Sequence, residues 1–562
     1  MSFKYPFLLK KLTKTNDFDA LTKAVENRTY PIAVTGVSHI QRVVLSASLA
    51  ANNGIKPIII TAGESENERV LEALEALGLS VAVFPSKDFV FKSNISYSRE
   101  YEHKRIGTLS KLLEGNFDVC VLSSEAAISA TIPPEKLKIR SFTLTTGEEF
   151  SQTELLNRLV AGGYTRAEQV DGAGQFSCRG SIVDIFTPNL PDPCRIDFFG
   201  DEVDSISCFD ADSQRRTDSL NSIKIVPVSE ISPDSQEELA KSLLNLSNSK
   251  KCSAKQKERI SEDVERLKAS MPIAYNAYIG HIYEGFSTIF DYIGSSYPTA
   301  VFVFDTNAVS ERIDNTLKLH SEEIKALLLE GQLPPDFKSV YLDRTEFARC
   351  LEAANAVFCD SFPKTSYDLP PKALINFNFK QNSGFTGAVS TLCEDIKAAG
   401  RKLTVILAGS EKAASNLCEE ICDNGITAVF QSEPARVGDE GIFVTTGVLS
   451  SGIELPELSV IVHGKAEIKK RKRRFSKGTA VGSIEELQRG DYVVHATHGI
   501  GIFEGVQQLT AHGMTRDYIK IAYAGKDALY VPVTSLDMVS KYIGSAEDTA
   551  VKLNKLGSSD WS

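Results

Sequence analysis

The sequence lacks the features that define several classes of protein. Its apolar runs, of which 57–61 is typical, are far too short to span a membrane, and residues 1–14 show no signal-peptide pattern. None of the ten cysteines belongs to a Cys-x-x-Cys pair, so neither a zinc site nor a disulfide framework is indicated. His495 and His498 form a close histidine pair without further ligands evident nearby, which favours a structural role. We therefore expect a cytoplasmic protein that makes no membrane contact and holds no metal.

The sequence also lacks an excess of positive charge. It has 62 Lys and Arg against 73 Asp and Glu, which gives a net charge of −11. A chain with this balance is not expected to coat DNA with its whole surface, so any contact needs a local basic patch. Six consecutive cations form such a patch: Lys469, Lys470, Arg471, Lys472, Arg473 and Arg474. A solvated linker is the favoured interpretation and a polyanion contact is the alternative, so we expect weak, salt-sensitive DNA binding.

Familiar catalytic motifs are missing too, since the chain contains no H-E-x-x-H and no G-x-S-x-G. Gly36 lies between a predicted strand and a predicted helix, where a phosphate-binding loop belongs. A working loop would continue with glycine at position 41, then lysine, then a hydroxyl residue, but the chain has Gln41, Arg42 and Val43. Such a loop cannot easily wrap phosphates or hold magnesium. We predict a degenerate loop that binds no nucleotide.

The composition is that of a globular protein, with 42% hydrophobic and 24% charged residues. The length of 562 residues is too great for one core, so roughly three to five domains are expected. The first part alternates between strands and helices. Strands are predicted over 32–35, 57–61 and 81–84, and helices over 65–77 and 101–113. This alternation predicts a mostly parallel sheet with helices on both faces.

The pattern changes between about residues 125 and 226. Strand-like segments over 176–186, 194–199 and 203–209 follow one another closely, which predicts a small insertion rich in antiparallel strands. A strand over 298–305 then resumes the first α/β unit.

A second α/β unit and a β-rich unit follow. Strands over 403–408 and 458–464, with a helix over 410–424, indicate a compact α/β alternation. Residues 490–539 are rich in strand-forming residues and punctuated by glycine, which is typical of a small barrel.

Two stretches are more specific than these patterns. The first comprises Gly162–Arg166, Gly174–Phe186 and Arg195–Ile206. It resembles the second domain of the excision-repair protein UvrB and the homologous module of the transcription-repair coupling factor family, Mfd. Within this comparison UvrB retains a working phosphate-binding loop and the Mfd module does not, so Gln41 and Arg42 favour Mfd.

The second stretch comprises Leu487–His495, His498–Gly505, Tyr518–Tyr523 and Leu529–Val533. It resembles the RNA-polymerase-interacting domain shared by Mfd and CarD-type regulators. The order of UvrB-like module, basic linker and polymerase-interacting domain is typical of Mfd.

This resemblance implies a multidomain α/β fold. It would contain a parallel sheet of the degenerate P-loop type, an inserted antiparallel α+β domain, a second small α/β domain and a C-terminal small β-barrel of the CarD/Tudor kind. We place UvrB-like domain 1a at 1–124, UvrB-like domain 2 at 125–226, UvrB-like domain 1b at 227–345, the small α/β domain at 346–465, a basic linker at 466–485, the barrel at 486–551 and the start of a connector at 552–562.

The resemblance also implies a function, that of a recruitment platform in transcription-coupled nucleotide excision repair. The barrel would bind the β subunit of a stalled RNA polymerase, and the UvrB-like module would bind UvrA. Family members continue into an ATP-driven translocase. We expect that motor, with its ATP and Mg²⁺, only in a longer form and expect no enzymatic activity from this chain. The alternative is an ATP-dependent DNA-handling enzyme like UvrB.

Candidate contact residues follow from the same resemblance. Arg166 and Arg179, with Phe186 as an apolar neighbour, are the candidates for the UvrA contact. An internal ion pair to Asp184 or Glu202 is the alternative role for either arginine.

The strand over 518–523 is the candidate for the polymerase contact. Its alternation leaves open which face points outward, so Ile519, Lys520 and Ile521 are all candidates. If its edge is unpaired, the strand could also add to a partner's sheet.

Overall fold

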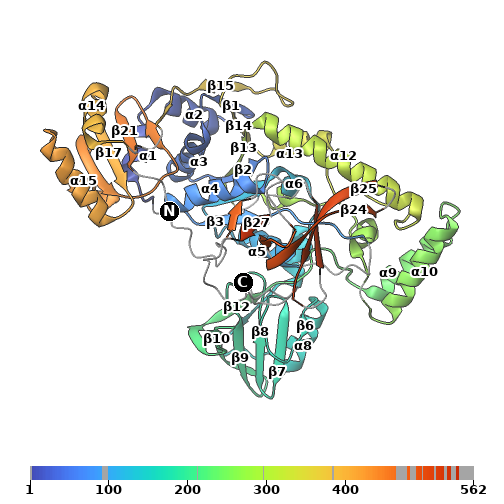
Figure 1. Cartoon of the computed structure of the whole chain (residues 1–562). Helices are drawn as coiled ribbons and strands as arrows, with labels where there is room; N and C mark the ends of the chain where they lie inside the picture. The colour runs from blue at the N-terminus through green and yellow to red at the C-terminus, as the bar shows by residue number, and fades with distance from the viewer. Residues whose placement is uncertain are drawn as a thin grey trace.

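A computed structural model shows a chain built on five β-sheets (Figure 1). Among the described residues, no helix is both long enough and apolar enough to cross a membrane. The structure describes residues 3–91, 99–211, 213–271, 273–294, 297–382, 385, 387–463, 478–480, 489–495, 498–511, 514–524, 528–532 and 539–542.

The first unit contains the predicted parallel sheet. Seven strands lie in the order β15-β1-β14-β13-β2-β4-β3, and every neighbouring pair is parallel. The central strands are buried, as expected for a parallel sheet whose faces are covered by helices. The strands are β1 (Ile32–Thr35), β2 (Lys56–Thr61), β3 (Val81–Phe84), β4 (Val119–Ser123), β13 (Thr299–Phe304), β14 (Ala356–Cys359) and β15 (Ala373–Asn376).

The helices of this unit begin and end at recognisable sequence signals. α3 (His39–Asn53) starts after Ser38, and its C-cap Gly54 has a φ of 65°, which favours glycine. The other helices of the unit are α2 (Asn16–Glu26), α4 (Glu64–Ala76), α5 (Glu100–Glu114), α6 (Ser124–Ile128), α7 (Pro134–Arg140), α12 (Thr306–Glu330) and α13 (Arg344–Ala353).

The predicted boundary at residue 345 is wrong. β14 pairs with both β1 and β13, and β15 pairs with β1 on its other side. The first sheet therefore continues to Asn376. A prediction based on local alternation could not assign these two strands, because both pair with β1, which lies more than 300 residues earlier in the chain.

The insertion forms a second, mostly antiparallel sheet in the order β11-β10-β9-β8-β7-β6. The predicted single strand over 176–186 is in fact a hairpin, because the chain turns at Gly180, whose φ is 60°. α8 (Gln152–Ala161) contributes Leu155 and Leu159 to the core of this unit. The remaining elements are β5 (Phe142–Thr145), β6 (Thr165–Arg166), β7 (Gln175–Arg179), β8 (Ile182–Ile185), β9 (Cys194–Phe199), β10 (Glu202–Phe209), β11 (Arg216–Leu220) and β12 (Ser222–Ile225).

A helical region connects the insertion back to the first sheet. Its helices α9 (Gln236–Ser247) and α10 (Ala254–Lys268) form a hairpin at the right-hand edge of Figure 1. A short helix, α11 (Ile279–Ile282), and two turns of 3-10 helix lead from α10 to β13.

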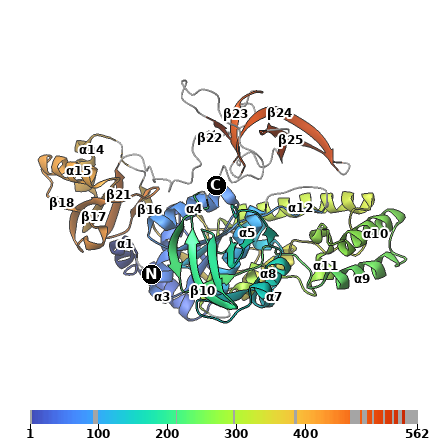
Figure 2. The same cartoon turned by 90° about the horizontal axis from the view of Figure 1, so that it is seen from below.

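The second α/β unit has its own six-stranded sheet, ordered β16-β20-β21-β17-β19-β18. The N-terminal helix α1 (Pro6–Leu12) lies against it, and Leu8 and Leu12 share a core with Leu403 and Val460 (Figure 2). The unit comprises β16 (Lys380–Asn382), α14 (Val389–Ala399), β17 (Leu403–Ala408), α15 (Glu411–Asp423), β18 (Val429–Gln431), β19 (Gly441–Thr446), β20 (Gly452–Glu454) and β21 (Leu458–His463).

The C-terminal unit is an antiparallel sheet in the order β22-β27-β23-β24-β25-β26. Closure of this sheet into a barrel stays a prediction. The strands are β22 (Gly478–Ala480), β23 (Tyr492–His495), β24 (Gly499–Ala511), β25 (Met514–Ala522), β26 (Ala528–Pro532) and β27 (Val539–Tyr542).

One buried ion pair lies where the insertion joins the first unit. The guanidinium of Arg105, on α5, donates to both carboxylate oxygens of Glu230 at 2.7 and 3.2 Å, and both side chains are fully buried. Arg105 also donates to the hydroxyl of Ser129 and the carbonyl of Ala130, while Thr131 donates to Glu230 at 2.7 Å. One guanidinium thus holds both the segment that leads to the insertion and the segment that returns from it.

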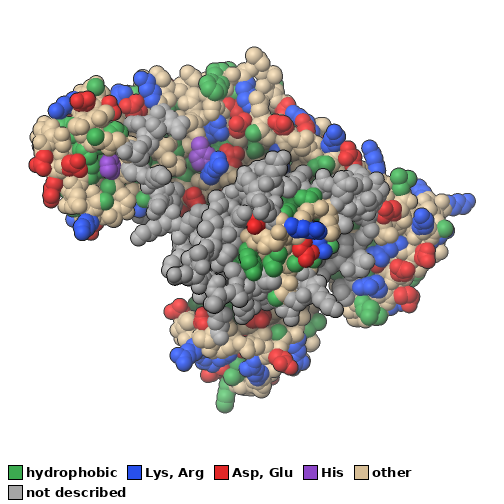
Figure 3. Space-filling view, viewed as in Figure 1, with side chains coloured by type: hydrophobic (Ala, Val, Ile, Leu, Met, Phe, Trp, Pro, Cys, Tyr) green, Lys and Arg blue, Asp and Glu red, His purple; other side chains and the backbone are tan. Residues whose placement is uncertain are grey.

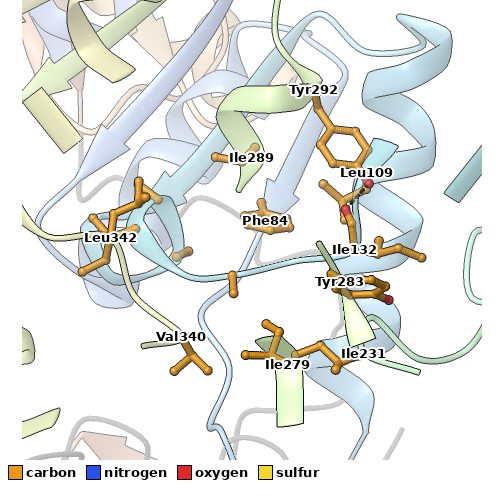
Figure 4. Close-up of a cluster of buried hydrophobic side chains, with 14 of the residues drawn as sticks. Phe84, Leu109, Ile132, Ile231, Ile279, Tyr283, Ile289, Tyr292, Val340 and Leu342 are labelled. Carbon is orange, nitrogen blue, oxygen red and sulfur yellow. Dashed lines mark hydrogen bonds between the residues drawn. The ribbon is translucent and has the colours of Figure 1, made fainter. Parts of the chain in front are cut away.

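Apolar side chains surround this network. Figure 4 shows Phe84, Leu109, Ile231, Tyr283 and other residues of one hydrophobic core, which segments far apart in the sequence contribute. The ring of Phe84 lies 3.9 Å from the Arg105 guanidinium carbon, and the Tyr283 hydroxyl donates to the Glu230 carbonyl at 2.6 Å. Burial alone would raise the pKa of Glu230, but Arg105, Lys87 and the hydrogen bonds hold that pKa below its ordinary value.

We predict that Arg105→Met destabilises the chain by about 3–5 kcal/mol, because it leaves a buried carboxylate without its main partner. The midpoint of urea unfolding at neutral pH measures this loss. Lys104→Met, on the same helix, is the matched control. It removes an exposed ion pair to Glu100 and a cation–π contact with Tyr101, and should cost about 1 kcal/mol or less.

The pH dependence gives a second readout of the same pair. A depressed carboxyl pKa stabilises the fold at pH values above the unfolded pKa, and this stability is lost as pH falls through the folded pKa. The difference between wild type and Glu230→Gln should therefore be largest at neutral pH and shrink in acid. An equal difference at both pH values would contradict this role.

Candidate functional site

A later segment of the chain packs against the start of the loop between β1 and α3, where a nucleotide-binding motif would lie. Gly36 has a φ of 76°, and a Cβ added there would lie 2.0 Å from the carbonyl oxygen of Phe377. The Phe377 amide donates to the Thr35 carbonyl at 2.9 Å, which fixes the segment after β15 against the loop. A backbone carbonyl therefore lies directly against the first glycine of the loop.

The two residues that replace the motif have structural roles. The Gln41 side-chain oxygen accepts from the Ser38 amide at 2.7 Å and so caps α3. Arg42 is buried, and it donates to the Val37 carbonyl at 3.2 Å and to the Ser361 hydroxyl at 2.8 Å. Burial, followed by the charges of Arg42 and Arg69, lowers the pKa of His39. Arg42 thus ties the loop to the segment after β14.

Sequence reasoning missed Asp360, which follows β14 beside the same loop. Its carboxylate accepts from the Thr306 amide at 2.9 Å and the Thr306 hydroxyl at 3.0 and 3.1 Å, and it pairs with Lys364 at 3.0 Å. An acidic residue at the end of a strand next to a phosphate-binding loop is where a magnesium-holding aspartate would lie. Here the carboxylate is already occupied by internal donors. Only the pairing of β14 with β1 could have revealed its position.

The three residues predicted to contact UvrA lie around β7. Arg166, on β6, pairs in register with Phe176, and Phe186 exchanges backbone hydrogen bonds with Gly174 and Gln175. Arg179 ends β7 about 10 Å further along the strand. Its guanidinium reaches back to the Glu168 carbonyl at 2.5 Å. Both arginines are exposed and Phe186 is half-buried.

The alternative role for these arginines is wrong where it invokes Asp184. That carboxylate is buried and accepts both hydrogen bonds from Arg195, at 2.7 and 2.9 Å. Asp184 and Arg195 are direct register partners on β8 and β9. Within the described part of the chain, neither Arg166 nor Arg179 forms an ion pair with Glu202 or any other carboxylate. The sequence analysis did not single out Arg195, because only the strand register brings it opposite Asp184.

The structure resolves which face of β25 points outward and corrects two of our predictions. Ile519 and Ile521 are fully buried in the core of the C-terminal sheet, whereas Lys520 lies on the other face and pairs with Glu504 at 2.8 Å. Over residues 518–522, β25 is paired on both sides, with β24 and β26, so this segment has no free edge for a partner's strand. The buried isoleucines are core residues and only Lys520 remains as a candidate contact.

The surface beside Lys520 includes a further residue that the sequence analysis did not single out. Tyr530, on β26, is the register partner of Lys520 and is 40% exposed. β26 is the outermost strand at this end of the described sheet. The tyrosine and the lysine therefore lie side by side next to the sheet's outer edge.

Two other predicted features have different outcomes. The rings of His495 and His498 stack at 4.8 Å, and burial lowers the pKa of His495 to about 3. Among the described residues, no group of three or more His, Cys, Asp or Glu side chains could hold a metal ion.

The six cations Lys469–Arg474 lie outside the described residues. On the face seen in Figure 3, basic and acidic side chains are interspersed over the α9–α10 hairpin and over the second α/β unit.

Comparison with known families assigns two of these regions. Residues 142–231 match the UvrB interaction domain, and residues 487–543 match the CarD-like/TRCF RID domain. The chain carries both interaction domains. The first contains Arg166, Arg179 and Phe186, and the second contains the sheet with Lys520 and Tyr530.

Similar proteins extend this resemblance to almost the whole chain. A transcription-repair-coupling factor of Bacillus subtilis strain 168 is 30% identical over 573 residues, covering 98% of this chain and 48% of the relative. Those of Staphylococcus aureus strain MRSA252 and Staphylococcus epidermidis strain RP62A are each 27% identical, covering 94% of this chain and 46% of the relative. The chain thus spans about half the length of these curated relatives, and the resemblance to this family is confirmed.

We predict that restoring the motif residues will not restore nucleotide binding. The triple variant Gln41→Gly/Arg42→Lys/Val43→Thr supplies the missing side chains, but the carbonyl of Phe377 still lies against Gly36. Calorimetric titration with Mg·ATP should show no saturable binding to the variant or to the unchanged chain, and circular dichroism checks that the variant folds. Micromolar binding by the triple variant would show that side chains alone disabled the loop.

Proposed function

We propose that the chain is a recruitment platform that connects RNA polymerase to the excision-repair protein UvrA. The observation that carries this proposal is the presence of two interaction domains in one chain. The name shared by the relatives, transcription-repair-coupling factor, agrees with such a connection. We infer that the parallel sheet is a scaffold rather than a catalytic centre, and the close packing of Phe377 against Gly36 supports this inference.

On the UvrA side, we assign the contact to Arg166 and Arg179, with Phe186 beside them. The two guanidinium groups are exposed and carry no carboxylate partner among the described residues. A planar guanidinium fork binds a carboxylate through two parallel hydrogen bonds, and lysine does not reproduce this geometry. An acidic surface of the partner therefore fits this part of the sheet.

On the polymerase side, we assign the contact to the face that carries Lys520 and Tyr530, and the β subunit remains the proposed target. Strand addition, if it contributes, uses the outer edge of β26 rather than β25. Tyrosine beside a charged residue is a common composition for an interface that is partly apolar and partly polar.

DNA and ATP have subordinate roles in this proposal. The basic run Lys469–Arg474 is proposed as a weak, salt-sensitive contact with DNA, as expected for lysine and arginine that neutralise phosphates. ATP and Mg²⁺ are proposed to act only in a longer form with a translocase motor. The rival function, a UvrB-like ATP-dependent enzyme, needs the nucleotide loop, and the contact between Gly36 and Phe377 weighs against it. DNA-stimulated ATP hydrolysis by this chain would favour the rival.

We predict that Arg166→Ala/Arg179→Ala weakens UvrA binding roughly tenfold or more, because each charge-assisted hydrogen bond contributes about 1.5–3 kcal/mol. Titration of UvrA by fluorescence anisotropy or calorimetry measures the effect. Arg216→Ala is the matched control in the same domain. Arg216 lies on β11, at the opposite end of the sheet, and is already paired with Asp197. Equal affinities for the double variant and the control would overturn the assignment.

We predict that Lys520→Glu reduces polymerase capture while the C-terminal sheet stays folded. The double variant Lys520→Glu/Glu504→Lys keeps the ion pair but moves the positive charge to β24. If polymerase contacts the positive charge at position 520, capture stays low in both variants. If Lys520 serves only to pair with Glu504, the double variant should recover polymerase capture. Ile519→Arg instead places a cation in the core and should unfold this sheet, as measured by proteolysis.

A further inference from the structure

Two cysteines face one another in the UvrB interaction domain. Cys194 on β9 and Cys208 on β10 are direct register partners, and their sulfur atoms are 3.8 Å apart. Both point toward the core of the insertion, where Cys194 is fully buried and Cys208 is half-buried. The UvrA and polymerase contacts proposed above do not use these two thiols.

The backbone around this pair suits a covalent bond. The Phe209 amide donates to the Pro193 carbonyl at 2.9 Å, which makes 193 and 209 a hydrogen-bonded pair. The next pair along an antiparallel ladder is non-hydrogen-bonded, with Cα atoms about 4.5 Å apart and side chains close together. Disulfides span Cα separations of about 4.4–6.8 Å. Cys194 and Cys208 can therefore be bridged without moving either strand far.

Of the two thiols, Cys208 is the more exposed. The ladder between β10 and β11 shifts register between Ser207 and Phe209, so Cys208 lies at a bulge. Bulges interrupt pairing and twist the strand locally. Burial, followed by the neighbouring Cys208, raises the pKa of the Cys194 thiol, which makes it a poor first nucleophile at neutral pH. The half-buried sulfur is thus the one that reacts first.

We propose that Cys194 and Cys208 form a reversible disulfide when the protein meets a peroxide. The Cys208 thiolate attacks one peroxide oxygen, which breaks the O–O bond and gives a sulfenic acid and hydroxide. The Cys194 sulfur then attacks the Cys208 sulfur and displaces its hydroxyl group as water. Overall two thiols lose two electrons and two protons, and hydrogen peroxide is reduced to two molecules of water.

The bond would act on the insertion as a clamp. It would join β9 to β10 beside the bulge, close to Phe209, whose ring lies 4.9 Å from the Arg195 guanidinium carbon. Because Arg195 also holds Asp184 on β8, the crosslink would restrain a set of contacts that runs across three strands. This inference concerns the insertion alone and stands or falls independently of the partners proposed above.

A second cysteine pair in the same chain provides a matched control. Cys418 and Cys422 lie four residues apart on α15, and like the proposed pair they combine a buried with a more exposed thiol. Cβ atoms four residues apart on a helix are about 5–6 Å from each other, whereas a disulfide needs about 3.5–4.5 Å. This pair cannot close without unwinding the helix.

The experiment treats the full chain with hydrogen peroxide, removes the oxidant, blocks free thiols with an alkylating agent and maps peptides by mass spectrometry. The expected product is a crosslinked peptide joining Cys194 to Cys208, two fewer free thiols than the ten in the sequence, and recovery of both after dithiothreitol. Hydrogen exchange of the β9 and β10 amides should slow in the oxidised form.

Variants make the result decisive. Cys208→Ser, at the half-buried position, should abolish the crosslink and the slower exchange, whereas Cys422→Ser should leave both unchanged. The proposal is overturned if Cys194 and Cys208 remain separately alkylated after peroxide, if Cys208 proceeds to sulfinic acid without crosslinking, or if a Cys418–Cys422 bond forms instead.

Discussion

The contact between Arg105 and Glu230 determines how the UvrB interaction domain is joined to the rest of the chain. The guanidinium reaches Ser129 and Ala130 before the domain, and Glu230 at its C-terminal end. Each of these groups is buried, so an unpaired member would carry a desolvation cost that the apolar side chains in Figure 4 cannot offset. The arrangement fixes both connections of the insertion to one point on α5. A binding surface on the insertion therefore has a defined position relative to the parallel sheet.

Internal contacts also hold the loop end of the parallel sheet. At the ends of β1 and β14, Phe377 packs against Gly36, Arg42 donates to Ser361 and Lys364 pairs with Asp360. The polar groups of both buried side chains are paired inside the protein. Arg42 donates to two acceptors, and the Asp360 carboxylate is bound by three donor groups. The surrounding segments, as well as three residues in the loop, thus distinguish this site from the phosphate-binding motif.

Sequence patterns predicted the parts of the fold whose signals are local. Helices predicted over 65–77 and 101–113 lie within one residue of α4 and α5, because apolar spacing defines a helix from its own residues. The departure of Gln41, Arg42 and Val43 from the phosphate-binding motif was also evident, because the motif is defined by residues next to one another in the sequence. The extent of the first sheet was not, because β14 and β15 are set by partners far away in the chain.

For the candidate contacts too, the sequence predicted local features, whereas strand pairing determined the rest. Alternation in β25 showed that two faces exist, but only the pairing with β24 and β26 determined which face is core and removed the free edge. In the insertion, Asp184 was equally available in the sequence to Arg179 and to Arg195. The strand register places Arg195 directly opposite Asp184. Arg166 and Arg179 lie on the strands at the other side of β8, and their side chains are exposed. Competition among arginines for one buried carboxylate thus determines which of them remain available to a partner.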